Sequence, residues 1–441
     1  MNWHVTCRVG PEDTYSPAIN DTDPRLMLSV EAPGAPQAMR CNFTEQFREH
    51  LGGLPIGAAG DLLNLATAVF TADVCIFRKL GEGRWTRDIT VHLPVLDPDL
   101  WAGAAEIITD LLGFLTGDRW SLILRHREPV KDERTPLEGE PPDVVSLFSG
   151  GLDSLVGAID LLSAGRRVAL VGHYGAGMTR TYQGRVAELF EQNYPGRTTL
   201  LLFHAQPPAI EGADAREQTM RSRSFLFIAL GVAVANRLGR GASLYVPENG
   251  LISLNVPLTV ARSGSNSTRT THPYYVNRFR DLLAALGLDH QLILPYRFKT
   301  KGEMLRECAD QQILAKATPL TMSCAHSEGG RWEGTSPGVH CGYCYPCLIR
   351  RAATSAAGTP DAAYTLDVLT DPPDATMPKG RDFRALSMAV ERFYGRPRRP
   401  PMFDVLDSGP VPPEEITPYT MAYQNGMDEL RAFLSVRRRS R

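Results

Sequence analysis

The segment Val144–Ser154, with the sequence VVSLFSGGLDS, constrains the fold of this chain more than any other stretch. Its first five residues are mostly apolar and β-prone, and they predict a buried strand. The turn Ser149-Gly150-Gly151 follows at once, and apolar residues with helical spacing then continue to Ser163. A strand that passes through glycines into a helix N-terminus is typical of an anion site, because the first helical N–H groups lack partners and the helix dipole is positive there.

The residue types in this turn suit a ligand that carries phosphates. Glycines let the backbone approach a phosphate closely, and the serine hydroxyls add donors. The carboxylate of Asp153 suits a magnesium ion that accompanies pyrophosphate. The sequence therefore predicts an ATP site with Asp153 as a catalytic residue, although an ordinary strand–turn–helix connection would look similar. The predicted ATP-binding residues here are Ser149, Gly150, Gly151, Leu152, Asp153 and Ser154.

Beyond this turn the chain alternates between predicted strands and helices. The strands are Val168–Val171, Thr198–Phe203, Ser243–Val246 and Gln291–Leu294, and the helices are Gln183–Gln192, Arg223–Leu238 and Arg278–Leu286. Such alternation predicts an α/β fold with a doubly wound parallel sheet and right-handed crossovers. Ligands of such sheets lie beyond the carboxyl ends of the strands. We therefore place His173 near the adenine of ATP, and Glu248 and Asn249 near a second substrate.

The sequence before and after this predicted sheet indicates two further structural units. Residues 1–37 read as an irregular arm with a strand, followed by helices at Leu62–Phe70 and Leu100–Leu115 and strands at Asp88–Leu93 and Trp120–Leu124. The linker Glu128–Pro142 carries four prolines and marks a boundary. The expected division is an α+β domain over 1–140, an ATPase domain over 141–352, and a helical extension over 353–441 with helices at Phe383–Phe393 and Met427–Val436.

Four of the eight cysteines lie within 24 residues and form a metal-binding pattern: Cys324, Cys341, Cys344 and Cys347. The last three are spaced C-x-x-C-x-x-C, and four thiolates can close a tetrahedral structural zinc site. An iron–sulfur cluster and a redox pair are the alternatives. We interpret the site as zinc that holds the C-terminal lobe onto the sheet.

Charge and hydropathy limit the partners to expect. The 47 basic and 49 acidic residues nearly cancel, so the overall charge does not indicate a nucleic-acid partner. The longest apolar run, Phe225–Ala235, is too short to span a bilayer, and the N-terminus lacks the apolar core of a signal peptide. We expect a cytoplasmic protein without a membrane partner.

Two sets of motifs resemble known enzymes. The run S-G-G-x-D-S resembles the PP-loop of the ATP pyrophosphatases. Together with T-x-S-C…C-G-x-C-x-x-C-L-x-R, it resembles the QueC family of 7-cyano-7-deazaguanine synthases. Arg223-Ser224 at the start of an apolar helix and Thr300-Lys301-Gly302-Glu303 also match that family. The resemblance covers residues 143–352 and implies the HUP-like fold of PP-loop enzymes. The second motif comprises Thr321, Ser323, Cys324, Cys341, Gly342, Cys344, Cys347, Leu348 and Arg350.

The resemblance implies that ATP adenylates the carboxylate of 7-carboxy-7-deazaguanine, with magnesium and a four-cysteine zinc site present. A cation must neutralise the charge that grows on phosphorus, and Lys301 is the candidate catalytic residue, with Arg223 as a phosphate ligand. The segment Glu248–Pro273 departs from the family, which has a short acidic loop there. We expect this segment to bind the deazaguanine through Glu248, Asn249, Arg262 and Arg269.

The added regions resemble the QueC-like proteins of bacterial anti-phage operons of the Qat and CBASS kinds. That resemblance implies an amide bond between the deazaguanine and the N-terminal amine of a protein from the same operon. We expect residues 1–140 to dock this protein, with Trp85 and Trp101 exposed. Three alternatives remain: a nitrile-forming synthase that uses ammonia, a PP-loop tRNA-modifying enzyme, and a nucleotide-sensing scaffold.

Overall fold

A computed structural model provides the structure of the chain. It describes residues 2–439 except for positions 21, 33, 36, 130–134, 137–138, 176, 209–215, 218, 220, 257–268, 329–337, 375 and 398. Side chains are described up to Ser435.

A six-stranded sheet forms the centre of the molecule. Its strands are β6 (Val144–Leu147), β7 (Val168–Tyr174), β8 (Thr198–Gln206), β9 (Leu244–Tyr245), β10 (Leu292–Ile293) and β3 (Arg40–Cys41). The order is β10-β9-β6-β7-β8-β3, and all neighbours are parallel except β3, which pairs antiparallel with β8. The predicted α/β fold with a parallel sheet is confirmed. The order reverses between β6 and β9, which makes this the switch point of the sheet.

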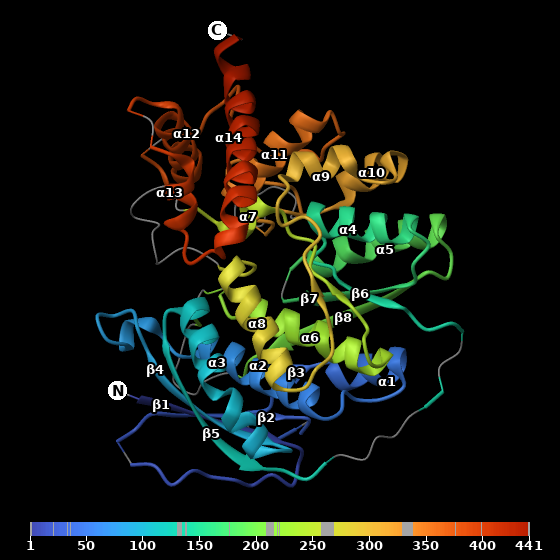
Figure 1. The fold of residues 1–441 in the computed structure, drawn as a ribbon, viewed down its shortest axis with the longest axis vertical. Helices are drawn as coiled ribbons and strands as arrows, with labels where there is room; N and C mark the ends of the chain where they lie inside the picture. Colours follow the sequence, from blue (N-terminus) through green and yellow to red (C-terminus); the bar gives the residue numbers. More distant parts are fainter. Residues whose placement is uncertain are drawn as a thin grey trace.

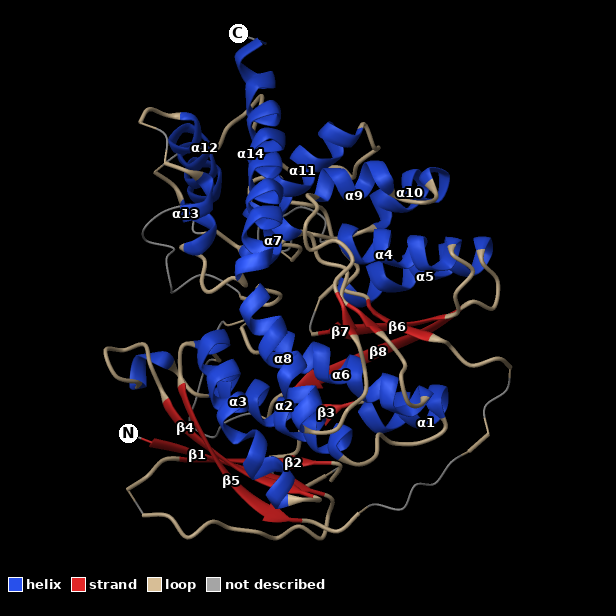
Figure 2. Ribbon diagram, viewed as in Figure 1, coloured by secondary structure: helices blue, strands red, loops and turns tan. Residues whose placement is uncertain are grey.

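Helices cover both faces of this sheet (Figures 1 and 2). One face packs against α4 (Leu152–Ser163) and α5 (Thr179–Asn193), and the other against α6 (Arg223–Leu238) and α8 (Pro273–Ala285). Helix α6 has the bounds that the sequence predicted. Apolar residues of β6 alternate between the cores on the two faces. Val144 packs in the core with α4 and α5, and Val145 packs in the core with α6 and α8, as a strand buried on both faces requires.

A second, four-stranded sheet lies in the N-terminal region, at the bottom of Figure 1. Its strands are β1 (Asn2–Val9), β2 (Arg25–Val30), β4 (Asp88–Val95) and β5 (Arg119–His126), in the order β2-β1-β4-β5. All neighbours are parallel, so this region is of the α/β kind and the expected α+β unit is corrected. Residues 1–37 supply two strands, one of them central, where we expected an irregular arm.

The α-helices that the structure describes in this region are α1 (Phe43–Leu51), α2 (Ala58–Cys75) and α3 (Pro98–Thr116). Helix α3 begins at the N-cap Asp97, whose carboxylate accepts from the backbone N–H of Leu100, with Pro98 in the first turn. Helix α2 is long and apolar enough to cross a membrane by length and composition, but 83% of it is buried inside the protein. Its apolar surface therefore serves the core.

One hydrophobic core joins the N-terminal region to the central sheet. Helix α2 packs on α6, and a single cluster of buried residues runs from Val5 of β1 through Leu65 of α2 to Val171 of β7. Buried charges add to this contact, because Asp73 of α2 accepts hydrogen bonds from Arg87 (2.6 Å) and from the Ser222 hydroxyl (2.8 Å) just before α6. The linker after residue 128 therefore does not separate two independent cores.

The C-terminal region packs as a helical lobe above the sheet (Figure 1). Its helices are α9 (Lys301–Glu307), α10 (Gln311–Ala317), α11 (Tyr345–Ala357), α12 (Arg381–Tyr394), α13 (Pro401–Leu406) and α14 (Ile416–Arg439). A capping box of Thr300 and Glu303 starts α9, and Glu429 of α14 accepts from the Thr300 hydroxyl at 2.5 Å. Helix α14 and the short α7 (Gly250–Leu254) share a core with α11 and α12.

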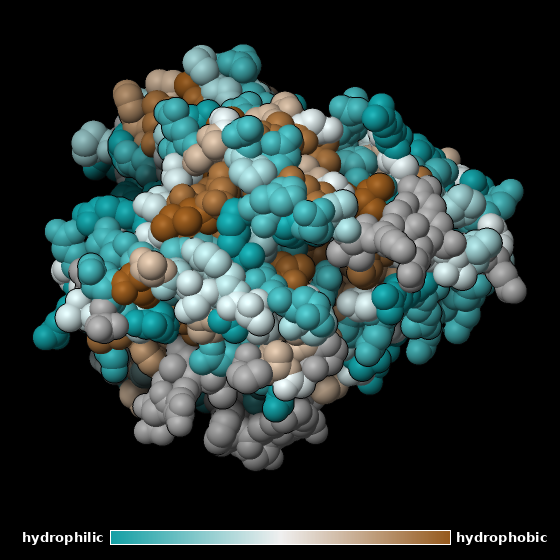
Figure 3. Space-filling view, turned by 90° about the horizontal axis from the view of Figure 1, so that it is seen from below, coloured by the Kyte–Doolittle hydropathy of each residue, from teal (hydrophilic) through white to brown (hydrophobic). Residues whose placement is uncertain are grey.

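The surface seen from below is mostly polar, and apolar residues occur there in separate patches (Figure 3). The expectation that Trp101 is exposed is wrong, because its side chain is fully buried in the core of the N-terminal region. Trp85 is half-buried, with the guanidinium groups of Arg221 and Arg78 lying 4.5 and 4.9 Å from its ring. Neither tryptophan is a free aromatic surface for docking.

Candidate functional site

The turn after β6 opens helix α4, as the sequence predicted. Gly150 adopts φ +84°, and a Cβ there would lie 3.1 Å from Cγ of Gln183, so the turn needs a glycine at this position. The Ser149 hydroxyl lies 3.3 Å from the Ser154 hydroxyl. Within the described residues no side chain caps α4, so the backbone N–H groups of its first turn have no side-chain partner. This geometry is suited to an anion.

A pocket of about 390 Å³ opens beside this turn. It lies at the switch point, because Ser149 follows β6 and Glu248 follows β9, its neighbour in the sheet. Its volume is at the lower end of those of small-molecule sites. Four of the residues predicted to bind ATP or the substrate line the pocket: Ser149, Ser154, Arg223 and Glu248.

Arg223 brings a cation to the pocket from the N-terminus of α6. Its Nε donates to Nδ1 of His173 at 3.1 Å and its terminal nitrogen to the His173 carbonyl at 2.8 Å. His173 is 2% exposed, and burial together with this guanidinium holds its pKa well below the usual value. A neutral imidazole behind Arg223 orients the guanidinium. His173 therefore supports the pocket without lining it.

Asp153 and Lys301 form a buried ion pair next to the turn. Lys301 Nζ contacts Oδ1 of Asp153, while the Asn249 amide donates to Oδ2 at 2.6 Å. Burial raises the pKa of Asp153, but the Lys301 ammonium and the hydrogen bonds outweigh burial and lower it. Both oxygens of Asp153 thus already have a partner within the protein, and we derive no step through the predicted magnesium ion.

Glu248 is the second carboxyl of this cluster. A hydrogen bond joins it to Asp153, and burial plus the negative charge of Asp153 raise its pKa well above 4.5. Two carboxyl groups this close share one proton, because both cannot be charged together. Asp153 carries the charge and Glu248 holds the proton. Glu248 therefore presents a neutral carboxyl group to the pocket.

The remaining predicted substrate residues lie elsewhere. Asn249 is fully buried, caps α7 through the Ile252 N–H, and bonds Asp153 behind the pocket. Arg269 donates to the Phe114 carbonyl at 3.1 Å and stacks on the Phe114 ring, so it contacts α3. Arg262 lies outside the described residues. Leu152 packs its side chain in the core, so only its backbone can contact a phosphate.

Several other residues that line the pocket were not predicted from the sequence. Thr179 and Tyr182 come from α5, Phe227 and Ile228 lie one turn after Arg223 in α6, and further liners are Met322 and Ser327. Thr270 and Thr271, which also line it, belong to the segment Glu248–Pro273 that we expected to bind the substrate, and Ser323 belongs to the second motif. The helical spacing from Arg223 could have indicated Phe227. The others come from loops or neighbouring helices whose position only the fold determines.

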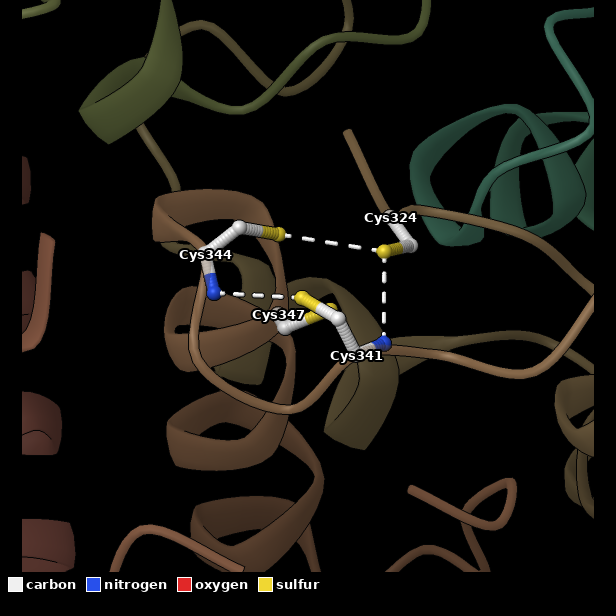
Figure 4. Close-up of side chains that lie close together, drawn as sticks. All are labelled: Cys324, Cys341, Cys344 and Cys347. Atoms are coloured by element: carbon white, nitrogen blue, oxygen red, sulfur yellow. Dashed lines mark hydrogen bonds between the residues drawn. The ribbon is translucent and has the colours of Figure 1, made fainter. Parts of the chain in front are cut away.

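The four predicted metal ligands meet at one point (Figure 4). Their sulfur atoms all lie within 4.8 Å of one another, and two pairs, Cys324–Cys344 and Cys341–Cys347, lie 3.9 Å apart. A tetrahedral zinc with Zn–S bonds of about 2.3 Å separates its sulfurs by about 3.8 Å. The geometry is consistent with zinc bound by four thiolates. Such a closed site would supply folding energy and leave no position for a substrate.

The cysteine cluster borders the pocket. Cys324 lines the pocket, and the Met322 N–H two residues earlier donates to the Gly150 carbonyl at 2.8 Å. Gly342 turns the chain between two ligands with φ +83°, where a Cβ would meet the Leu366 carbonyl oxygen at 2.0 Å. The segment that supplies the first cysteine thus also holds the Ser149-Gly150-Gly151 turn. The cluster attaches the C-terminal lobe at the edge of the pocket.

Comparison with known proteins adds no family: no protein-family model matches the sequence, and a search of curated proteins finds no match.

Proposed function

We propose that this protein is an ATP-dependent ligase that adenylates the carboxylate of a deazaguanine and then joins it to an amine. The observation that carries this proposal is the S-G-G-x-D-S turn at the switch point, beside a pocket lined by Arg223 and Glu248. The turn suits the pyrophosphate half of ATP, since it combines an uncapped helix N-terminus with two hydroxyl donors.

The chemistry follows from the leaving group. A carboxylate does not react with an amine at neutral pH, so its oxygen first attacks the α-phosphorus of ATP and the bond to the β-phosphate oxygen breaks, releasing pyrophosphate. The amine then attacks the acyl carbon, AMP leaves, and the nitrogen loses a proton. Arg223 would stabilise the charge that develops on the phosphates, because a cation oriented in advance contributes most in a closed site.

Glu248 supports a purine-like substrate. A deazaguanine ring presents two adjacent N–H donors on one edge, which a carboxyl group can accept side by side. Glu248 offers its carboxyl group at the pocket, with a proton that it shares with Asp153. Binding of such an edge would favour the ionised form of Glu248 and release that proton.

The proposed acceptor is a protein amine. A groove of about 1360 Å³ lies between the N-terminal region and the carboxyl ends of β7 and β8, with Tyr174 and His204 on the sheet side and Glu45 and Arg48 of α1 on the other. Such a groove has room for an extended peptide, whereas ammonia needs none. This observation favours a protein over ammonia, and the resemblance to anti-phage QueC-like proteins suggests a partner from the same operon.

The test of adenylation is pyrophosphate release by the full-length protein with ATP and 7-carboxy-7-deazaguanine. Release should depend on the carboxylate and slow about tenfold in Ser154→Ala, which loses one hydroxyl donor at the turn. Ser163→Ala, at the far end of the same helix, is the matched control and should keep the full rate. Pyrophosphate release without the carboxylate, or equal rates in the two variants, would contradict the proposal.

The acceptor is tested by intact-mass measurement of candidate partners co-expressed with the full chain. A gain equal to an amide-linked deazaguanine on the partner's N-terminal residue is the expected result. Accumulation of free 7-cyano-7-deazaguanine with unmodified partners would favour the ammonia-dependent synthase.

A further inference from the structure

A second cavity lies at the carboxyl edge of the N-terminal sheet. It has a volume of about 300 Å³ and is bounded by Val9 and Val30 at the ends of β1 and β2, and by Leu96 directly after β4. The N-terminus of the 18-residue helix α2 closes one side through Gly57 and Gly60. Open parallel sheets bind ligands at this edge, and this sheet, too, is entirely parallel.

The cavity has apolar walls and one side-chain amide. Phe43, Phe47, Leu54 and Leu63 line it. The side chain of Asn64 also lines it and makes no hydrogen bond to the part of the chain that the structure describes, although the residue as a whole is only 5% exposed. An amide in the wall of a cavity can bond a ligand without giving up a protein partner. Asn64 therefore suits a ligand with a polar head.

The charges around the cavity favour an anionic head. Arg127 and Arg48 line it against one acid, Glu31. Asp61 holds Arg127 in place by accepting from its Nε at 2.7 Å, and does not itself line the cavity. The guanidinium of Arg48 makes no hydrogen bond or ion pair within the described residues. Because Asp61 already offsets the charge of Arg127, Arg48 is the cation that the described lining offers to a ligand, beside a helix N-terminus that no side chain caps.

We propose that this cavity binds a small organic carboxylate with an apolar body, at a site separate from the nucleotide pocket. The apolar body lies against Phe43, Phe47 and Leu63, and the carboxylate accepts from the amide of Asn64 and the guanidinium of Arg48. The cavity opens beside the larger groove, with which it shares Arg48 and Leu54 in its wall. The ligand can therefore enter from that groove.

The test uses octanoate and 4-phenylbutyrate as probes, with octanamide and 4-phenylbutanamide as neutral matches, titrated into the full-length protein by calorimetry. At least one carboxylate should bind at a single saturable site, and its amide at least about tenfold more weakly, the loss expected for one charge-assisted hydrogen bond. Arg48→Ala and Asn64→Leu should each weaken carboxylate binding by a similar factor. Circular dichroism and the melting temperature of each variant establish that it is folded.

The control is Arg84→Ala, which replaces an exposed arginine that does not line the cavity. This variant should bind the carboxylate like the natural protein. Saturating ATP should leave carboxylate binding unchanged, which separates this site from the proposed nucleotide site. If Asn64→Leu does not fold, Arg48→Ala alone decides, because that side chain is exposed and free of structural bonds. No saturable binding by either carboxylate, or equal binding by Arg48→Ala and Arg84→Ala, would overturn the proposal.

Discussion

At the scale of single residues, the pair of Asp153 and Lys301 determines how the predicted catalytic groups are arranged. Their side chains are 9% and 10% exposed and contact each other, although 148 positions separate them in the chain. A buried ion pair contributes little net stability, but the removal of one partner leaves a charge without compensation. The pair therefore holds α4 against α9 only while both members are present.

We predict that Lys301→Met lowers the free energy of unfolding by about 3–5 kcal/mol, because Asp153 then stays buried without its cation. In the double variant with Lys301→Met and Asp153→Asn, the loss of unfolding free energy should be smaller than the sum of the losses in the two single variants. Urea unfolding of the two single variants and the double variant measures this coupling. Lys299→Met, which breaks the exposed pair with Glu307, is the control and should cost about 1 kcal/mol or less. Equal losses at Lys301 and Lys299 would refute the interpretation.

The raised pKa of Glu248 predicts that the free energy of unfolding depends on pH. Its pKa in the folded protein is raised well above 4.5, mainly by burial and then by Asp153. The folded state therefore keeps a proton that the unfolded state releases. The stability from this group is fully present below about pH 4.5 and is lost as pH rises through the folded pKa.

We expect Glu248→Gln to remove this loss, since glutamine does not titrate. The stability difference between the natural protein and Glu248→Gln should fall with pH, by at most about 1.4 kcal/mol per pH unit for one proton. Urea unfolding at several values between pH 5 and pH 8 measures the difference. A difference that stays constant over this range would show that Glu248 is already ionised in the folded protein.

At the scale of elements, the cysteine cluster connects α11 to the turn that opens α4. We predict one zinc ion per chain, and Cys344→Ser should lose it and melt at a lower temperature, because metal binding contributes to folding. Cys308→Ser is the matched control: Cys308 is buried in a different core and should leave the zinc content at one. Elemental analysis of the purified proteins measures the zinc and iron content per chain. Iron in the natural protein, or full zinc in Cys344→Ser, would contradict the assignment.

At the scale of the whole molecule, the two sheets depend on a shared layer of helices. Helix α6 packs one side on the central sheet and the other on α2, and its residues Phe225 to Ala235 are almost all buried. Without residues 1–140, much of this apolar surface would face water, at roughly 25 cal/mol per Å² of exposed apolar area.

We therefore predict that residues 141–441 expressed alone bind the dye ANS and unfold without a cooperative transition. Co-expression with residues 1–140 as a separate chain should restore cooperative unfolding, since the same core can form between two chains. Fluorescence with ANS and thermal melts of the two preparations measure this. A cooperative melt of residues 141–441 alone would show that the N-terminal region is dispensable for folding.

What the sequence determined by itself is local. Three features could be predicted because each depends on residues close in the chain. Periodicity and the glycines of a turn predicted the strand, turn and helix at Val144–Ser163, periodicity predicted the bounds of α6, and ligand spacing predicted the four-cysteine site. The strands of the parallel sheet could be predicted for the same reason. Their order, with β9 beside β6, could not be read from any one strand.

Only the tertiary structure decided the long-range pairings. Three features depend on contacts between elements that lie far apart in the chain. They are the strand direction in the N-terminal region, the burial of Trp101, and the hydrogen bonds to Asp153 from Asn249 and Lys301. The sequence assigned magnesium to Asp153 because a carboxylate at a phosphate-binding turn is a good ligand. The fold instead placed an ammonium and an amide on its oxygens, since a buried charge needs partners and packing brought these two within reach.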